Sequence, residues 1–284
     1  MNIKLSKNEK GSVMFLILPS IAGLMIFYLI PYILMLGYSI FAKGSVTERY
    51  LLVLNNSVFQ LAAKNTLIFT GISVPLLIVL SMLLAISLNK NIFFKEHLRT
   101  SFILPLVLPV ASIILFFEMF FDLNGVLNYF RYVVGLEPVN WINSKYAMVV
   151  IVTIYIWKNI GYNMILFLAG LQSIPDVYYE AAWLDGAGRF KSFKHITFVY
   201  LMPTTFFALI ISIINSFKVF KEVYILTGAY PHNSIYMLQH YMNNLFHKLE
   251  YTKLVTAAII MSFIIVIIVA ILFKIQKRIM DIIS

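Results

Sequence analysis

Long apolar runs separated by short polar segments dominate this chain. Five stretches of 32, 25, 18, 23 and 20 residues lack Asp, Glu, Lys and Arg; they lie between Lys10 and Lys43, Lys64 and Lys90, Arg99 and Glu118, Lys194 and Lys218, and Lys253 and Lys274. A helix crosses a bilayer with about 20 apolar residues. The runs therefore predict membrane-spanning helices, and none of them alternates as the strands of a membrane barrel do.

Six spans are predicted, over residues 13–41, 65–88, 98–121, 146–171, 204–226 and 254–273. The first follows a basic start, as a secretion signal does, but it is longer than the about 7–15 apolar residues of a signal and should stay in the membrane. The fourth contains Lys158, and we interpret it as one span that carries a charge. The predicted fold class is an all-α integral membrane protein, with residues 1–284 forming one domain around a six-helix bundle.

Composition supports this prediction, because 61% of the residues are apolar, 12% are charged and the mean hydropathy is +0.88. These values exclude a soluble enzyme, a disordered chain and a disulfide scaffold. The chain has no cysteine, so it offers no thiolate metal site, and its five histidines show no metal-ligand spacing. We predict no metal site.

The net charge of +10 follows the membrane topology. Basic residues collect on the cytoplasmic side of membrane proteins, so their positions indicate orientation. Four segments hold three each, twelve of the 22: Lys4, Lys7 and Lys10; Lys90, Lys95 and Arg99; Arg189, Lys191 and Lys194; Lys274, Lys277 and Arg278. Both termini are therefore predicted to be cytoplasmic, and the positive charge needs no nucleic-acid partner to explain it.

Residues 172–200, between the fourth and fifth spans, form a segment with both signs of charge at high density. Ser173 and Asp176 are spaced like a helix cap, and Pro175 suits a first helical turn. A short helix should end at Gly186 and Gly188, with a second over about 190–195. Two short helices joined by a glycine bend are therefore predicted at the cytoplasmic surface; an amphipathic linker in the lipid interface is the alternative.

A family resemblance rests on this segment. Glu180, Ala181, Ala182, Asp185, Gly186 and Ala187 stand in the string Glu-Ala-Ala-Trp-Leu-Asp-Gly-Ala, followed by Phe190, Phe193, Ile196 and Pro203. This string closely resembles the EAA signature of permease subunits in bacterial binding-protein-dependent ABC importers. Further matches, such as Asn65-Thr66 and 168–175, extend the resemblance over nearly the whole chain, toward carbohydrate permeases similar to MalF and UgpA. The chain departs from the family at Val199, where proline is common.

The resemblance implies a non-catalytic permease that imports a sugar or oligosaccharide by alternating access, in the bacterial cytoplasmic membrane. Its EAA segment would couple it to two ATP-binding subunits, which hold the ATP and Mg²⁺; this chain needs no cofactor and contains no Gly-x4-Gly-Lys-Ser/Thr phosphate loop. A second homologous permease and an extracytoplasmic solute-binding protein complete the expected partners.

Polar residues within the spans indicate where the solute passes. A charge in hydrocarbon costs about 3 kcal/mol or more unless it faces a wet interior. Lys158, Tyr162 and Asn163 lie in the fourth span and Asn215 in the fifth. We hypothesise that these four line the solute path. The alternative is a structural role, with Lys158 paired to Glu118 or the residues packed against the partner permease.

Other functions stay open at this point. An importer of another small solute, such as a glycerol phosphate or a polyol, would carry the same signature. A secondary transporter would require inverted repeats and acidic residues at mid-membrane, and neither is evident. An integral membrane enzyme would require clustered His, Asp or Glu near one interface.

Overall fold

The computed structural model describes residues 7–41, 44–89 and 93–283, and within these ranges it is built of helices. The N-terminal part contains α1 (Lys7–Leu24), a π-helical turn (Met25–Leu29), α2 (Ile30–Phe41), α3 (Val46–Leu54) and α4 (Ser57–Leu88). The middle contains α5 (Lys95–Val107), α6 (Val110–Phe121), α7 (Val126–Val133) and α8 (Ala147–Gln172). The remainder contains α9 (Asp176–Leu184), α10 (Arg189–Ser192), a π-helical turn (Phe193–Thr197), α11 (Phe198–Ser216), α12 (Phe220–Thr227), a 3₁₀ turn (Asn233–Ile235), α13 (Leu238–His247) and α14 (Tyr251–Ile283).

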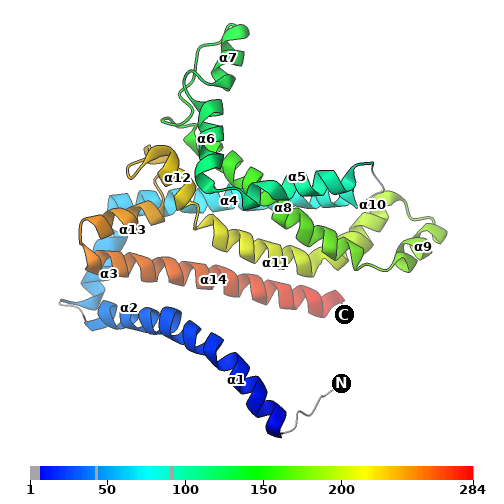
Figure 1. The fold of residues 1–284 in the computed structure, drawn as a ribbon, viewed down its shortest axis with the longest axis horizontal. Coiled ribbons are helices and arrows are strands. Elements are labelled where there is room, and N and C mark those ends of the chain that lie inside the picture. The colour runs from blue at the N-terminus through cyan, green and yellow to red at the C-terminus, as the bar shows by residue number, and fades with distance from the viewer. Residues whose placement is uncertain (1–6, 42–43, 90–92, 284) are drawn as a thin grey trace.

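The long helices α4, α5, α8, α11 and α14 lie along a common direction (Figure 1). One end of this bundle carries α9 and α10, and the opposite end carries α3, α12 and α13. The first turn of α1 and the end of α14 both point toward the α9 end. The two ends of the bundle therefore differ, and the first turn of α1 and the end of α14 both lie toward the end that carries α9.

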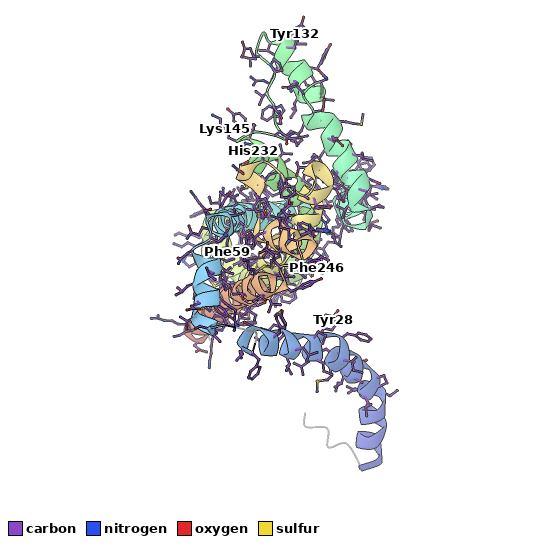
Figure 2. The ribbon with its side chains drawn as sticks, turned by 90° about the vertical axis from the view of Figure 1, so that its left-hand side faces the viewer. Tyr28, Phe59, Tyr132, Lys145, His232 and Phe246 are labelled. Carbon is purple, nitrogen blue, oxygen red and sulfur yellow. The ribbon has the colours of Figure 1, made fainter. Side chains whose placement is uncertain are left out.

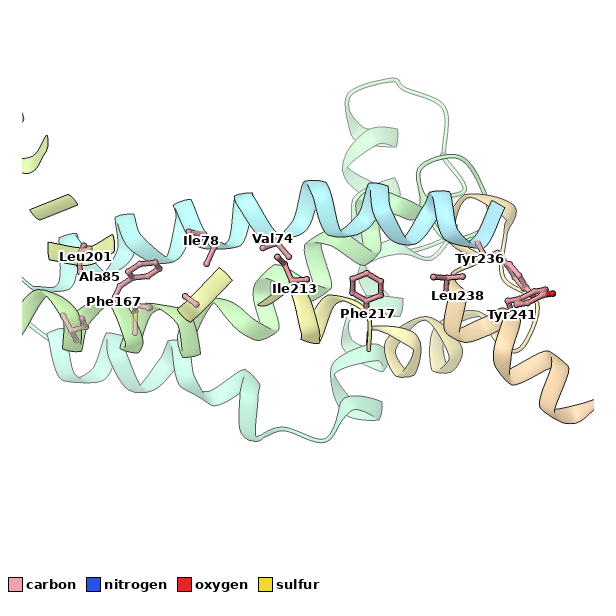
Figure 3. Packing of buried hydrophobic residues seen from close by; sticks show 14 of the residues in the cluster. Val74, Ile78, Ala85, Phe167, Leu201, Ile213, Phe217, Tyr236, Leu238 and Tyr241 are labelled. Carbon is pink, nitrogen blue, oxygen red and sulfur yellow. The ribbon is translucent and has the colours of Figure 1, made fainter. Parts of the chain in front are cut away.

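Apolar side chains join α4, α8 and α11 into one core. Val74, Ile78 and Ala85 of α4 are buried against Phe167 of α8 and Ile213 of α11, and the cluster continues to α13 (Figure 3). The backbones of α5 and α8 come into contact at Gly161, where an added Cβ would lie 1.8 Å from the carbonyl oxygen of Phe102. The core is therefore centred on α8, the helix that carries Lys158.

Six helical stretches of the described chain are long and apolar enough to cross a membrane: Leu16–Phe41, Ser57–Leu88, Val110–Val133, Ala147–Gln172, Arg189–Thr227 and Tyr251–Ile279. The sequence predicted the same number. The fourth is one continuous helix with Lys158 inside it, as interpreted. The fifth starts earlier than predicted, because α10, the π-helical turn and α11 follow one another without a break.

The prediction of one helix over 98–121 is wrong. α5 ends at Val107, Leu108 is extended with a ψ of 141°, and α6 begins after Pro109. Proline disfavours the helical conformation in the residue before it and offers no backbone N–H to continue a helix. The chain changes direction here, and α6 and α7 form an arm that leaves the bundle, with Tyr132 at its tip (Figures 1 and 2).

The first apolar stretch also stands apart from the bundle. Contact with the bundle is made by α2 along α14, while the preceding π-helical turn contains no buried residue. Tyr28 lies on this separated helix, and its side chain is 74% exposed (Figure 2). So much exposed apolar surface is typical of helices covered by lipid or by another subunit.

Candidate functional site

The α9 segment ends in a left-handed glycine turn. The N–H of Ala187 donates to the carbonyl of Ala182 at 2.8 Å, and the N–H of Gly186 donates to the carbonyl of Trp183 at 3.0 Å. This pair of bonds is the Schellman arrangement, which requires a residue with positive φ, and Gly186 has φ +72°. The predicted glycine stop at Gly186 is therefore present.

The predicted Ser173 cap is wrong. Pro175 occupies the N-cap position of α9 without a side-chain bond, and the Ser173 hydroxyl instead donates to the carbonyl of Gly170 at 2.8 Å, on the preceding helix. A proline-imposed extended conformation is enough to start the new helix here, because φ is fixed and the chain must turn. Asp176 remains in the first turn, where its charge favours the helix dipole.

Two tyrosines hold α9 against the start of α11. The Tyr179 hydroxyl lies 2.9 Å from the Thr197 hydroxyl, and the rings of Tyr178 and Tyr200 have centroids 5.2 Å apart. Ile174, just before α9, is buried at 5% exposure. These contacts join α9 to the π-helical turn and to α11.

The outer surface of this segment is open. Glu180, Ala181, Asp185 and Gly186 are exposed, and Ala182 and Ala187 are half-buried. Trp183, Leu184 and Phe190 are 77%, 80% and 77% exposed. A surface that combines large apolar side chains with two carboxylates suits a protein partner. In the sequence, Phe190 was noted only as part of the family string and Trp183 and Leu184 were given no role, although large apolar side chains in an otherwise polar segment are a recognisable signal.

Lys158 pairs with Glu222, not with Glu118. The Lys158 Nζ atom lies 2.5 Å from Glu222 Oε1, and the two side chains are 19% and 8% exposed. Glu118 is exposed on α6, which leaves the bundle with the arm. The pairing alternative proposed from sequence named the wrong carboxylate, because Glu118 lies on the exposed side of α6 while its neighbour Phe117 packs against α8.

Further polar contacts join the same helices. The Tyr155 hydroxyl of α8 donates to the carbonyl of Ser212 at 2.8 Å, and the Ser212 hydroxyl donates to Asn163 Oδ1 at 3.3 Å. The hydroxyls of Thr70 on α4 and Ser216 on α11 lie 2.8 Å apart. The helices α4, α8 and α11 are thus connected by polar bonds within an otherwise apolar core.

The four residues predicted to line a path differ in exposure. Lys158, Tyr162 and Asn215 are half-buried, whereas Asn163 is 2% exposed and its amide donates to the carbonyl of Asn159 at 3.2 Å. On α8, Tyr162 is followed by the exposed residues Ile165 and Ala169, which lie on the same side of the helix at spacings of three and four. An accessible stripe therefore runs from the Lys158–Glu222 pair toward the α9 end.

A groove of about 400 Å³ follows the contact between α5 and α8. Its lining includes Ser101 and Pro105 of α5 and Thr153, Trp157 and Ile160 of α8. Trp157 also packs against Phe116 and Phe117 of α6, with ring centroids 6.2 and 5.4 Å away. The groove lies on a different side of α8 from Lys158, because neighbouring helix positions point about 100° apart.

Comparison with known proteins identifies relatives over most of the chain. Residues 77–281 match the family model described as "Binding-protein-dependent transport system inner membrane component". The lactose transport system permease protein LacF of Rhizobium radiobacter is 33% identical over 270 residues, covering 91% of this chain and 90% of the relative. The arabinooligosaccharides transport system permease protein AraP of Bacillus subtilis is 35% identical, covering 73% and 69%. The trehalose/maltose permease protein MalF of Thermococcus litoralis is 31% identical, covering 77% of each.

Solved structures share the fold. A chain of a bacterial ABC transporter that imports the acidic polysaccharide alginate superposes with a TM-score of 0.83 at 23% identity, covering 95% of this chain and 96% of that one. A chain from the alginate ABC transporter in complex with an alginate pentasaccharide-bound periplasmic protein gives 0.85 at 23% identity, with 96% coverage of both. At this identity the likeness concerns the arrangement of helices.

Proposed function

This chain belongs to the family of binding-protein-dependent transport system inner membrane components, and from that premise we propose that it is the permease subunit through which an ATP-driven importer carries a sugar or oligosaccharide. The observation that carries the substrate class is similarity at 31–35% identity to permeases of lactose, arabinooligosaccharide and trehalose/maltose transport. The match to LacF extends over nearly the full length of both chains, so it includes the loops as well as the helices.

In this proposal the open surface of α9 is the coupling site for an ATP-binding subunit. Glu180 and Asp185 offer carboxylates to basic groups of the partner, and the exposed side chains of Trp183 and Leu184 supply apolar contact. Two ATP-binding subunits would hold the ATP and Mg²⁺, one below this chain and one below a second homologous permease. An extracytoplasmic binding protein would deliver the solute at the opposite end.

The orientation follows from the same assignment. If α9 faces the cytoplasm, the first turn of α1 and the end of α14 face it too, because they point toward the same end of the bundle (Figure 1). The basic residues Lys274, Lys277 and Arg278 at the end of α14 then lie on the cytoplasmic side, as basic flanking residues usually do. We therefore propose that both termini are cytoplasmic.

The solute path is proposed to include the accessible stripe on α8. Tyr162 would offer a ring and a hydroxyl, and Lys158 and Asn215 would offer hydrogen-bond donors, a combination that suits sugar hydroxyls. Asn163 would not contact the solute. Its side chain is enclosed between α8 and α11 and would hold the accessible stripe in place. Movement of α9 would shift α8 and α11 together and so open the stripe to one side or the other.

The test is uptake by the assembled importer in proteoliposomes. The complex would be supplied with ATP inside and with its binding protein plus lactose, maltose or arabinotriose outside. ATP-dependent accumulation of at least one saccharide is expected. Uptake of only a glycerol phosphate or a polyol would refute the saccharide assignment, and uptake without ATP would refute the importer assignment.

Coupling is tested by Glu180→Lys, which reverses a charge on the proposed contact surface. We expect solute-stimulated ATP hydrolysis to fall at least tenfold, or the ATP-binding subunit to be lost from the complex. Glu137→Lys is the matched control, because Glu137 is exposed and its carbonyl accepts from Arg131 Nε of α7, in the arm that lies away from α9 (Figure 1). Normal stimulation in the Glu180→Lys complex would exclude α9 as the coupling site.

The path residues are tested by Lys158→Ala, Tyr162→Ala and Asn215→Ala. Each should reduce the uptake rate while the four-subunit complex still assembles. Unchanged uptake in all three would show that the path lies elsewhere.

A further inference from the structure

A second concave site lies at the end of the bundle opposite α9. Four segments surround a pocket of about 420 Å³: the start of α4, the loop from 228 to 237, α13 and the start of α14. Its volume is within the about 300–1,000 Å³ range of small-molecule sites. None of its lining residues belongs to α8, so it is separate from the Lys158 stripe.

Three tyrosines contribute to the lining. Tyr230 is 71% exposed, while Tyr236 and Tyr241 are 9% and 5% exposed. Burial raises the pKa of both Tyr236 and Tyr241, so each stays a neutral phenol that can donate a proton to a ligand oxygen. The Tyr241 hydroxyl makes no hydrogen bond to any residue in the described ranges.

Amide groups in the lining retain unused hydrogen-bonding capacity. The Asn244 amide nitrogen donates to the carbonyl of Ala229 at 3.0 Å and to the Tyr236 hydroxyl at 3.1 Å, which leaves its Oδ1 as an acceptor. Asn56 accepts two backbone bonds through Oδ1, from Val58 and Phe59, and its amide nitrogen is left to donate. Donors and acceptors are therefore both present around one cavity.

The wall of the pocket is fixed by two buried residues of α4. Asn65 donates to the carbonyls of Asn233 and Tyr236 at 2.6 and 2.9 Å, and Thr66 accepts from the N–H of Leu238 at 3.0 Å. Both side chains are nearly inaccessible, at 6% and 2% exposure. The loop that carries Tyr230 and Tyr236 is thus held against α4, and little ordering is required when a ligand binds.

We propose that this pocket is a saccharide subsite at the entrance of the permease, occupied by a sugar before it reaches the α8 stripe; this rests on the proposed function. Aromatic faces cover the C–H faces of a sugar ring, and amides and phenols satisfy its hydroxyls. The only ion pair at the rim, among the described residues, joins Lys253 and Glu250 at 2.5 Å. Lys248 also lines the pocket and adds an ammonium donor for sugar hydroxyls, so the lining carries one cation beyond this pair.

The experiment uses the full importer complex in nanodiscs, without the binding protein. The probe is whichever of lactose, maltose and arabinotriose gives the highest uptake in proteoliposomes, and its binding is measured by saturation-transfer NMR and calorimetry. Tyr230→Ala should weaken binding about 2- to 10-fold, because one aromatic contact contributes about 0.5–1.5 kcal/mol. Tyr241→Phe removes only the free hydroxyl and should weaken binding several-fold.

Uptake kinetics supply a second readout. Both variants should raise the half-saturating sugar concentration and leave the maximal rate intact, because the pocket precedes the path. Tyr129→Ala is the matched control, since Tyr129 is a 64% exposed tyrosine on the arm. Wild-type affinity and half-saturation in both pocket variants would overturn the proposal, as would a cross-link showing the pocket filled by a side chain of another subunit. An importer that takes up no saccharide would instead refute the proposed function.

Discussion

Lys158 on α8 and Glu222 on α12 form an ion pair that is mostly shielded from solvent, with Nζ and Oε1 2.5 Å apart. α12 also contacts α6 of the arm and α13. The pair therefore connects the central helix of the core to the elements at the end opposite α9. It also gives Lys158, the one charge in the middle of the fourth span, a counter-charge from the fifth apolar stretch.

Removing one partner of this pair should destabilise the chain more than removing both. Lys158→Met or Glu222→Met alone leaves an uncompensated charge, which costs about 3–5 kcal/mol, and the double variant should recover at least half of that loss. Thermal unfolding of the purified complex, followed by intrinsic fluorescence, measures the loss in the single variants and the recovery in the double variant. Lys253→Met is the control, because the Lys253–Glu250 pair has the same length but is 52% and 36% exposed, and its loss should leave the melting temperature unchanged. Strictly additive effects of the two Met substitutions would contradict this account.

The spans could be predicted from sequence because hydropathy along the chain is a local property. The α9 segment was predictable for a similar reason, since Gly186 and the preceding alanines define a helix and its stop within ten residues. The break after α5 was missed, although Leu108-Pro109 is a local signal, because Pro19, Pro75 and Pro203 stand inside helices that continue. The presence of a proline therefore does not tell whether a helix continues through it or ends before it.

Contacts between residues far apart in the chain could not be predicted from the sequence. Lys158 is 64 positions from Glu222, and Asn65 is 168 positions from the Asn233 carbonyl to which it donates. The choice between Glu118 and Glu222 depends on where the arm goes, which is a property of the tertiary structure. The pocket opposite α9 was missed for the same reason, because its four segments meet only in the folded chain.

Gly161 should tolerate no side chain. A Cβ there would overlap the Phe102 carbonyl oxygen at 1.8 Å, and both residues stand inside helices whose backbones cannot yield locally. Gly161→Ala should therefore separate α5 from α8 and cost about 3 kcal/mol or more. Gly71→Ala is the matched control, because Gly71 is also inside a long helix but has nothing within 4 Å of the added atom. Equal melting temperatures for the two variants would refute the close contact.

The turn after α9 should require glycine at only one of its two glycine positions. Gly186 has φ +72°, whereas Gly188 has φ −69° and open space around it. Gly186→Val should cost about 1–2 kcal/mol locally and tilt α9, which should lower solute-stimulated ATP hydrolysis in the assembled importer. Gly188→Ala should leave hydrolysis at the wild-type rate. A Gly186→Val complex with full stimulation would show that α9 functions without this turn.

His240 should make the α12–α13 region sensitive to acid. Its ring is fully buried between Phe220 and Tyr236, with centroids 4.8 and 5.9 Å away, and neither ring nitrogen has a partner among the described residues. Burial lowers the pKa of His240 to about 4. The unfolded chain, with an ordinary histidine pKa of about 6.5, binds the proton first, so stability falls as the pH drops from about 6.5 toward 4.

The free energy of unfolding should fall by about 1–2 kcal/mol between pH 7 and pH 5. It should appear as a lower melting temperature of the complex at pH 5, and His240→Phe, which fills the same aromatic site without a titrating group, should reduce the difference between the two pH values. His247→Phe is the control, since His247 is exposed on the same helix and should leave the pH dependence as in the wild type. An identical pH dependence in the His240→Phe complex would assign the acid sensitivity to other groups.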